Sequence, residues 1–480
     1  MEQIANLLNG ELMPPLSGQY MDNYNPSTGR VYSQVPSCDQ DDVNLAVESA
    51  KKAFEKWSKT PTADRVSLMM KLADLIDRDK EALAIAESQD QGKPLWLARS
   101  VDIPRASANL RFFAHAVMNH KSVAFTDTAN VVEYINRPSI GPCALISPWN
   151  LPLYLLTWKV APCIATGNTA ICKPSELTPM TAFLFSQLVI EAGFPPGVIN
   201  IIHGPGGVTG EALIQHKDVP VISFTGGTKT GAHIATQVAP HFKKLSLELG
   251  GKNPNIIFAD CDYEKALSTS VRASFLNQGE ICLCGSRIFV EQSLYPKFLS
   301  DFVLETDKLI VGDPMSKKSF LGALVSQQHL EKVKSYVQLA RQEGGLVHTQ
   351  EDVVGLDPTL TEGYFMRPTV ISGLSHECRV QQEEIFGPVV TITPFQSEEQ
   401  VLAMANSVPF GLSASLWTQN SDRVHRVGGQ IKSGTVWVNS WMYRNLRAPL
   451  GGMKHSGQGR EGGDYSLNFF TETQNISIRY

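Results

Sequence analysis

Two reactive side chains stand out in the sequence, a cysteine and a glutamate. Cys282 lies in the segment 275–287, Phe-Leu-Asn-Gln-Gly-Glu-Ile-Cys-Leu-Cys-Gly-Ser-Arg, where Cys284 follows it by two residues. Upstream, Glu248 lies in an apolar run and precedes a leucine and two glycines. A thiol nucleophile and a carboxylate that activates water are the two groups that covalent oxidation of an aldehyde needs. The segment alone does not decide which cysteine reacts.

The two cysteines also have structural interpretations. No further Cys or His follows at the spacing of a zinc finger, so a metal site is not expected. In an extended segment, a spacing of two places Cys282 and Cys284 on opposite faces, so that one faces a cleft while the other packs. A buried structural cysteine is the common alternative for either.

Glu248 alternates with leucines in the run 245–249. If this strand is buried, the carboxyl has a raised pKa and suits a general base. Because Ser246 and Glu248 share one side of the strand, a surface-facing position stays open as an alternative.

Short apolar runs alternate with helix-length segments from residue 143 onward. Strands are predicted at 144–147, 169–172, 198–202, 221–224 and 245–249, and helices at 179–192 and 208–216. This alternation predicts a parallel sheet wrapped by helices, which binds ligands at the carboxyl ends of its strands. A second α/β region is predicted from about 252 to 440, with strands at 287–290, 389–394 and 435–439. Earlier, apolar residues at helical spacing predict helices over 41–57 and 64–86.

Two extended, alternating stretches, 131–135 and 474–480, fit neither region. Lone strands must pair with something. We expect a small projecting sheet that also pairs with another subunit.

A glycine-rich turn follows the predicted strand 221–224. Gly226 and Gly227 open a helix there, where backbone amides can approach a phosphate. The spacing is not the usual dinucleotide-binding fingerprint, so a plain turn remains an alternative. The glycines of 204–207 form a competing candidate that is more typical of a loop.

Polar residues also end two other predicted strands. Lys173 and Glu176 could bind ribose hydroxyls, and an acidic group there disfavours a 2′-phosphate, which favours NAD over NADP. The alternative to a ribose site is that this segment forms a proline turn and then caps the next helix. Asn150 could donate to an oxyanion, although base rates favour a helix cap.

Arginines supply a third kind of candidate. Arg105, Arg444 and Arg447 carry the guanidinium fork that binds a carboxylate through two hydrogen bonds. For any single arginine, a solvated surface position is the commoner outcome.

Composition narrows the class of protein. The 480 residues predict two or three domains. The 42 basic and 47 acidic residues give a net charge of −5, which argues against a nucleic-acid binder. No apolar run reaches about 18 residues, so we expect no membrane span. The start of the chain lacks the features of a signal peptide. The eight cysteines, mostly single in apolar runs, predict reduced thiols and a cytoplasmic location.

Together these motifs resemble the aldehyde dehydrogenase superfamily over essentially the whole chain. The resemblance rests on Pro148-Trp149-Asn150, Lys173-Pro174-Ser175-Glu176, Phe224-Thr225-Gly226, Glu248-Leu249-Gly250-Gly251-Lys252, Asn277-Gln278-Gly279 with Cys282, and Glu383-Glu384-Ile385-Phe386-Gly387-Pro388. It implies an α/β fold with a Rossmann-type parallel-sheet NAD-binding domain (1–120 and 139–250), an α/β catalytic domain (251–448) and a small oligomerisation β-sheet (121–138 and 464–480). A homo-dimer or homo-tetramer follows from the same resemblance.

The resemblance also implies residue roles. Cys282 resembles the family nucleophile, Glu248 the general base, Asn150 with the Cys282 amide the oxyanion hole, and Glu461 a proton relay. The implied NAD contacts are Ile146, Ser147, Trp149, Lys173, Glu176, Gly226, Gly227, Leu249, Glu384 and Phe386.

A narrower resemblance is to the aminomuconate and hydroxymuconate semialdehyde dehydrogenases. It rests on residues 147–159, 102–105 and 278–284. In that branch two arginines bind the carboxylate of the substrate, and Arg105 and Arg444 match them. Leu450 departs from the usual phenylalanine, which puts the local packing in doubt.

The implied activity is NAD-dependent oxidation of 2-aminomuconate or 2-hydroxymuconate 6-semialdehyde in aromatic or tryptophan catabolism. A broader aliphatic or betaine aldehyde dehydrogenase is the alternative among enzymes. An enzyme-derived structural or NAD-binding protein is the alternative outside them.

Overall fold

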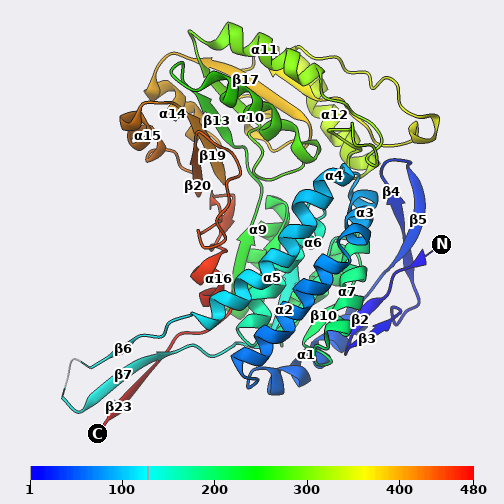
Figure 1. Cartoon of the computed structure of the whole chain (residues 1–480), viewed down its shortest axis with the longest axis vertical. Helices are drawn as coiled ribbons and strands as arrows, with labels where there is room; N and C mark the ends of the chain where they lie inside the picture. The colour runs from blue at the N-terminus through cyan, green and yellow to red at the C-terminus, as the bar shows by residue number, and fades with distance from the viewer. Residues whose placement is uncertain (1, 127–128) are drawn as a thin grey trace.

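The computed structural model describes residues 2–126 and 129–480. Met1 and residues 127–128, which fall in the predicted ranges 1–120 and 121–138, lie outside the described residues. Two large sheets, each covered by helices, lie one above the other, and a thin arm projects from the lower one (Figure 1).

The first sheet has eight strands in the order β22-β12-β11-β8-β9-β10-β2-β3. Its five central strands are parallel, with the bounds β12 Lys244–Glu248, β11 Val221–Thr225, β8 Pro142–Ile146, β9 Thr169–Lys173 and β10 Ile199–Ile201. These strands occupy all five predicted positions. Antiparallel strands close both edges, namely β2 Asn6–Leu8 with β3 Glu11–Met13, and β22 Gly457–Gln458. The central strands are mostly buried, as parallel strands between helical layers should be.

The helices around this sheet agree with the prediction except at two places. Helix α1 (Gln40–Trp57) matches 41–57, and α7 (Met180–Ala192) matches 179–192. The predicted helix 64–86 is wrong, because α2 (Thr62–Arg78) and α3 (Lys80–Gln91) are separate helices that meet at Asp79. The apolar spacing continues across the break because both helices pack on the same core. The stretch 208–216 forms a π-helical turn, Gly206–Gly210, and the short α8 (Glu211–Gln215).

The second sheet has seven strands in the order β15-β16-β17-β14-β13-β19-β20. Their bounds are β15 Leu346–Val347, β16 Thr369–Ser372, β17 Val389–Phe395, β14 Arg287–Glu291, β13 Pro254–Ile257, β19 Ser413–Trp417 and β20 Thr435–Val438. All pairs are parallel except β15 with β16. The helices of this region are α10 Tyr263–Phe275, α11 Tyr295–Asp307, α12 Gln327–Gln342, α14 Glu398–Asn406 and α15 Ser421–Gly428. The three strands predicted here are confirmed.

The projecting arm is an antiparallel sheet in which β7 (Val131–Asn136) lies between β6 (Ala124–Phe125) and β23 (Gln474–Arg479). Both extended stretches predicted from the sequence are strands of this arm (Figure 1). The range 464–480 is not all strand, because α16 (Gly463–Phe469) precedes β23. This helix folds onto the body of the protein, since Leu467 and Phe470 are buried in the core of the first domain.

Two further small sheets complete the fold. One joins β1 (Glu2–Gln3), β5 (Arg30–Pro36) and β4 (Tyr20–Asn25), and the other joins β18 (Phe410–Gly411) to β21 (Met453–Lys454). Within residues 2–126 and 129–480, no helix combines the length and the apolarity that crossing a bilayer requires.

Candidate active site

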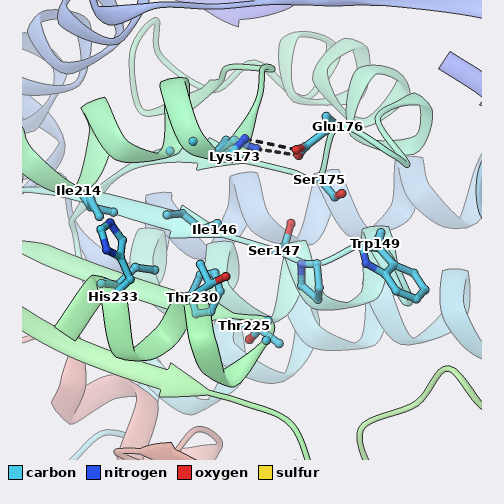
Figure 2. Close-up of a pocket in the computed structure, with 18 of the residues that line it drawn as sticks. Ile146, Ser147, Trp149, Lys173, Ser175, Glu176, Ile214, Thr225, Thr230 and His233 are labelled. Atoms are coloured by element: carbon cyan, nitrogen blue, oxygen red, sulfur yellow. Dashed lines mark hydrogen bonds and ion pairs between the residues drawn. The ribbon is translucent and has the colours of Figure 1, made fainter. Parts of the chain in front are cut away.

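A cleft of about 750 Å³ lies at the carboxyl ends of β8, β9 and β11 (Figure 2). This is the edge of a parallel sheet at which ligands are expected. The predicted cofactor residues that line the cleft are Ile146, Ser147, Trp149, Lys173, Glu176, Gly226 and Gly227.

Both glycine-rich segments contribute to this cleft, so they are not competing alternatives. Gly226 and Gly227 separate β11 from α9 (Thr228–Val238), while Gly206 and Gly207 also line the cleft. Gly227 caps α9 without any side-chain hydrogen bond to the first amides of the helix. Free amides at a helix N-terminus favour a phosphate or another anion.

Lys173 and Glu176 point toward each other beside the end of β9 (Figure 2). Lys173 Nζ lies 3.2 Å from Glu176 Oε2, and Glu176 Oε1 accepts a 3.2 Å hydrogen bond from the Gly206 amide. Although burial acts to raise the pKa of Glu176, the Lys173 charge and the backbone donors outweigh it and lower the pKa. The helix-cap alternative is wrong, because Pro179 caps α7 without a side-chain hydrogen bond.

A second chamber of about 260 Å³ adjoins the cleft and shares Trp149 and Gly226 with it. The other predicted residues that line this chamber are Asn150, Glu248, Leu249, Cys282, Glu384 and Phe386. The fold therefore brings the thiol, the carboxylate and the amide from three distant segments to one cavity.

Cys282 lies on a turn rather than in the extended segment that the sequence suggested. The Cys284 amide donates to the Ile281 carbonyl at 3.0 Å and closes this turn. Cys284 is 5% exposed and packs in an apolar cluster, whereas Cys282 is partly exposed and faces the chamber. The two thiols thus differ in exposure, although a turn and not a strand separates them.

The Cys282 thiol lies in an electrostatically unfavourable place for a thiolate. Burial, followed by the charges of Glu384 and Glu248, raises the pKa of Cys282 to about 12, and the Arg444 charge opposes the rise. The thiol is therefore neutral near pH 7 in the free protein.

Glu248 is the last residue of β12 and is 6% exposed, so the surface-facing alternative is wrong. Its Oε1 atom has no hydrogen-bond partner among the described residues. Burial and then the charge of Glu461 raise the pKa of Glu248 well above its usual value, against the opposing charges of Lys159 and Arg444. A carboxylate with a raised pKa and a free oxygen suits a general base.

Glu461, the predicted relay residue, is held by a buried lysine. Lys159 Nζ donates to Glu461 Oε1 at 2.9 Å. Both backbone hydrogen bonds between Leu450 and Glu461 measure 2.8 Å. Leu450, the departure from the family pattern, therefore positions Glu461 through its main chain. The side chains of Leu450 and Glu461 line a third, smaller chamber, which also borders Cys282.

Asn150 is buried and does not cap a helix. Helix α6 (Pro152–Ala165) has Leu151 at its N-cap, and the Leu151 side chain makes no hydrogen bond to the first amides. The Asn150 side chain instead donates to the Glu280 carbonyl at 2.8 Å. Since an amide group carries two N–H donors, one remains for a ligand in the chamber.

Glu384 and Phe386 lie in a strained and tightly packed segment of the chamber wall. Glu384 Oε1 accepts a 2.8 Å hydrogen bond from the Gly251 amide. A Cβ atom on Gly250 would lie 2.0 Å from Glu384 Oε2, so any larger residue there would displace the Glu384 carboxylate. Phe386 has a φ of 63°, and its ring packs edge-on against Trp149 at 5.3 Å.

His329 and Lys332 also line the chamber, and the sequence analysis missed both. His329 Nε2 lies 2.7 Å from the Phe386 carbonyl, and its ring is 5.1 Å from that of Trp149. Both residues belong to the amphipathic helix α12, where single polar residues carry no local signal of a site.

The two predicted clamp arginines lie on aromatic rings of one helix. Arg444 is 4.9 Å from the Trp158 ring, and Arg105 is 5.8 Å from the Tyr154 ring. Tyr154 and Trp158 are four residues apart on α6 and share one face. Arg444 also lines the third chamber, the one lined by Leu450 and Glu461, together with Cys282 and Glu248.

Comparison with known proteins decides the family. Residues 14–476 match the model of the aldehyde dehydrogenase family. The chain belongs to the aldehyde dehydrogenase family. It is 52% identical to the 2-aminomuconic semialdehyde dehydrogenase of Danio rerio, over 99% of this chain and 98% of that protein. It is 41% identical to the 2-hydroxymuconic semialdehyde dehydrogenase of Pseudomonas sp. (strain CF600), over 100% of both.

Solved aldehyde dehydrogenases have the same fold. An aldehyde dehydrogenase of Bacillus cereus, solved as its NAD+ complex, superposes with a TM-score of 0.96 at 37% identity. The match covers 100% of this chain and 97% of that structure. The fold expected from the sequence is therefore confirmed.

We expect Glu461→Gln to shift the acidic limb of the pH profile of kcat to lower pH. A base is active above its pKa, and removing the neighbouring negative charge lowers the pKa of Glu248. Steady-state kcat measured across pH checks the shift, with Glu472→Gln at an exposed position of the same segment as the control. A limb that stays in place would contradict the coupling of the two carboxyls.

Proposed function

We propose that this aldehyde dehydrogenase uses NAD to oxidise 2-aminomuconate 6-semialdehyde, or its 2-hydroxy analogue, to the dicarboxylate. The observation that carries the proposal is the position of Arg444, which lines one chamber with Cys282 and Glu248. The names of the relatives from Danio rerio and Pseudomonas support the same substrate class.

A carboxylate on the substrate suits this pair of arginines. Neither Arg105 nor Arg444 forms an ion pair with another described residue, so both cations are available to a ligand. Arginine stacked on an aromatic ring keeps its N–H groups free for a carboxylate. A cation at this place opposes binding of a quaternary ammonium, which argues against a betaine aldehyde.

NAD fits the cleft described above. Lys173 and Glu176 would bind the adenosine ribose, and the free amides at the start of α9 would bind the diphosphate. Trp149, Glu384 and Phe386 would hold the nicotinamide half. When bound, NAD supplies the acceptor for the hydride of the aldehyde.

The residues of the chamber would then divide the chemistry among them. Cys282 gives its proton to Glu248, which passes it on to solvent, and the sulfur attacks the carbonyl carbon while the Asn150 side chain with the Cys282 amide stabilises the oxyanion. Loss of the hydride leaves a thioester on Cys282. Glu248 takes a proton from the water that hydrolyses the thioester, and the acid is released.

The arm of β6, β7 and β23 would join subunits into a dimer or a tetramer. The strand β23 forms one edge of the arm. Phe125, Tyr134, Ile478 and Tyr480 are exposed apolar side chains on the arm. A three-stranded arm has little core of its own, and pairing with another chain covers both its edge and its apolar surface.

We expect Arg105→Ala and Arg444→Ala each to lower kcat/KM for the carboxylated semialdehyde by about 10- to 100-fold, the size of a lost charged hydrogen bond. An uncharged aldehyde of similar length should lose far less with Arg105→Ala. Steady-state NADH production measures both. Arg447→Ala, an exposed arginine of the same loop as Arg444, is the matched control.

Two results would contradict this proposal. If both variants retain normal kcat/KM on the carboxylated substrate, the clamp is wrong. If the native protein binds NAD but forms NADH from no aldehyde, the protein has a binding role instead.

We expect Glu176→Ala to raise KM for NAD and to narrow the preference for NAD over NADP. The variant removes both the acceptor for ribose hydroxyls and the negative charge that repels a 2′-phosphate. The ratio of kcat/KM for the two coenzymes measures this change. An unchanged ratio would place the ribose contact elsewhere.

We expect deletion of residues 474–480 to reduce the oligomer to a smaller species. The deletion removes β23 and the edge of the arm, while the core containing Leu467 remains. Light scattering after size-exclusion chromatography gives the mass, and circular dichroism checks folding. A folded variant with the native mass would contradict the assignment of the arm.

A further inference from the structure

A buried cluster of three charged side chains lies behind the chamber. Lys93 is fully buried, and its Nζ lies 2.6 Å from Asp102 Oδ2 and 3.6 Å from Glu87 Oε1. The same Nζ donates to the backbone carbonyl of Asn150 at 2.9 Å. Burying a lysine is costly unless its charge is paired, so the ammonium must stay next to Asp102, Glu87 and the Asn150 carbonyl.

Asn150 is held on both sides by this arrangement. Its carbonyl accepts hydrogen bonds from Lys93 and, at 3.2 Å, from the Asn277 side chain. Its side chain donates to the Glu280 carbonyl at 2.8 Å. The backbone of Asn150 therefore cannot move without breaking the contact with Lys93.

The cluster also joins the segments that carry the substrate-facing groups. Asp102 ends the π-helical turn Ala98–Asp102, three residues before Arg105 at the start of α5 (Ile103–Met118). Glu87 Oε2 accepts a hydrogen bond of 3.4 Å from the Leu153 amide in the first turn of α6. Since that turn has no other side-chain cap, Glu87 takes the place of one.

Burial acts against the negative charges of the cluster. It raises the pKa of Glu87 to about 8 and also raises the pKa of Asp102, while the charge of Lys93 acts against both rises. The Lys93 ammonium between the two carboxyls compensates their buried charge, which makes burial of the cluster tolerable.

We propose that Lys93 is a positioning residue for catalysis, whose ammonium fixes Asn150 and, through Asp102, ties the oxyanion donor to the helix that carries Arg105. The inference rests on the proposed function, because it assigns Asn150 to the oxyanion hole. Lys93 acts through Asn150 and touches neither the aldehyde nor the cofactor.

A double-mutant cycle between Lys93→Met and Asn150→Ala tests the proposal. The rate of NADH formation in a single turnover at saturating aldehyde reports, as one step, the addition of sulfur and the hydride transfer in which the oxyanion forms and collapses. We expect Asn150→Ala to slow this step by about 100- to 1,000-fold, as loss of an oxyanion donor does. Lys93→Met should slow it by about 10- to 100-fold in the native background, the cost of a misplaced group.

In the Asn150→Ala background, Lys93→Met should have almost no further effect, because no side chain remains to be positioned. A merely structural role would slow both backgrounds by the same factor, and that result would overturn the inference. A normal rate for Asn150→Ala would instead overturn the assignment of Asn150 in the proposed function. The two failures are therefore distinguishable.

Two further variants protect the test against loss of folding. Lys93→Met/Asp102→Asn removes both charges of the ion pair and replaces Lys93→Met in the cycle if that variant is unfolded. Arg65→Met is the matched control, since Arg65 is a buried cation that donates to the Ala165 carbonyl at the far end of α6. It should lower the melting temperature and leave the single-turnover rate unchanged.

Discussion

The active centre of this aldehyde dehydrogenase is governed by the cost of burying a carboxylate, which must be ionised to act as a base or to bind a ligand. An ionised carboxylate stays in a protein interior only when an opposite charge compensates it. The compensated pairs here are Lys93–Asp102 at 2.6 Å, Lys159–Glu461 at 2.9 Å and Lys173–Glu176 at 3.2 Å. Glu248 differs from these acids, because no lysine or arginine among the described residues lies within ion-pair distance of it and its Oε1 atom has no hydrogen-bond partner there. The paired acids are held in place by their lysines, whereas Glu248 keeps a free oxygen and a raised pKa, both of which suit a base.

These pairs also hold together parts of the chain that are remote in sequence. Lys159 and Glu461 are 302 residues apart, and their ion pair ties α6 to the segment after the second sheet. The same segment adds β22 to the edge of the first sheet beside β12, which ends at Glu248. The base and its acidic neighbour therefore approach each other because the chain returns to its first domain.

The sequence predicts elements well where a local pattern dictates them. Buried parallel strands appear as apolar runs between glycines and prolines, so β8, β9 and β11 can be located from the position of these runs in the sequence. The break at Asp79 has no glycine or proline to mark it, and an apolar stripe continues across it. The turn at Cys282 cannot be predicted in this way, because glycine-flanked polar segments allow either a turn or an extended chain. Lys93 and His329 could not be found at all, since their roles depend on contacts with residues more than fifty positions away.

Arg444 has two electrostatic effects that oppose each other. Its charge lowers the pKa values of both Cys282 and Glu248 against the effect of burial. A carboxylate bound to Arg444 alone would cancel much of that charge just when an ionised sulfur and an ionised base are needed. In the proposed clamp a second cation would resolve the conflict, because one carboxylate shared between Arg105 and Arg444 would leave one net positive charge beside Cys282 and Glu248. The proposed pair of arginines, which stack on two rings of α6, would therefore suit this chemistry better than a single arginine, for reasons of charge as well as of substrate geometry.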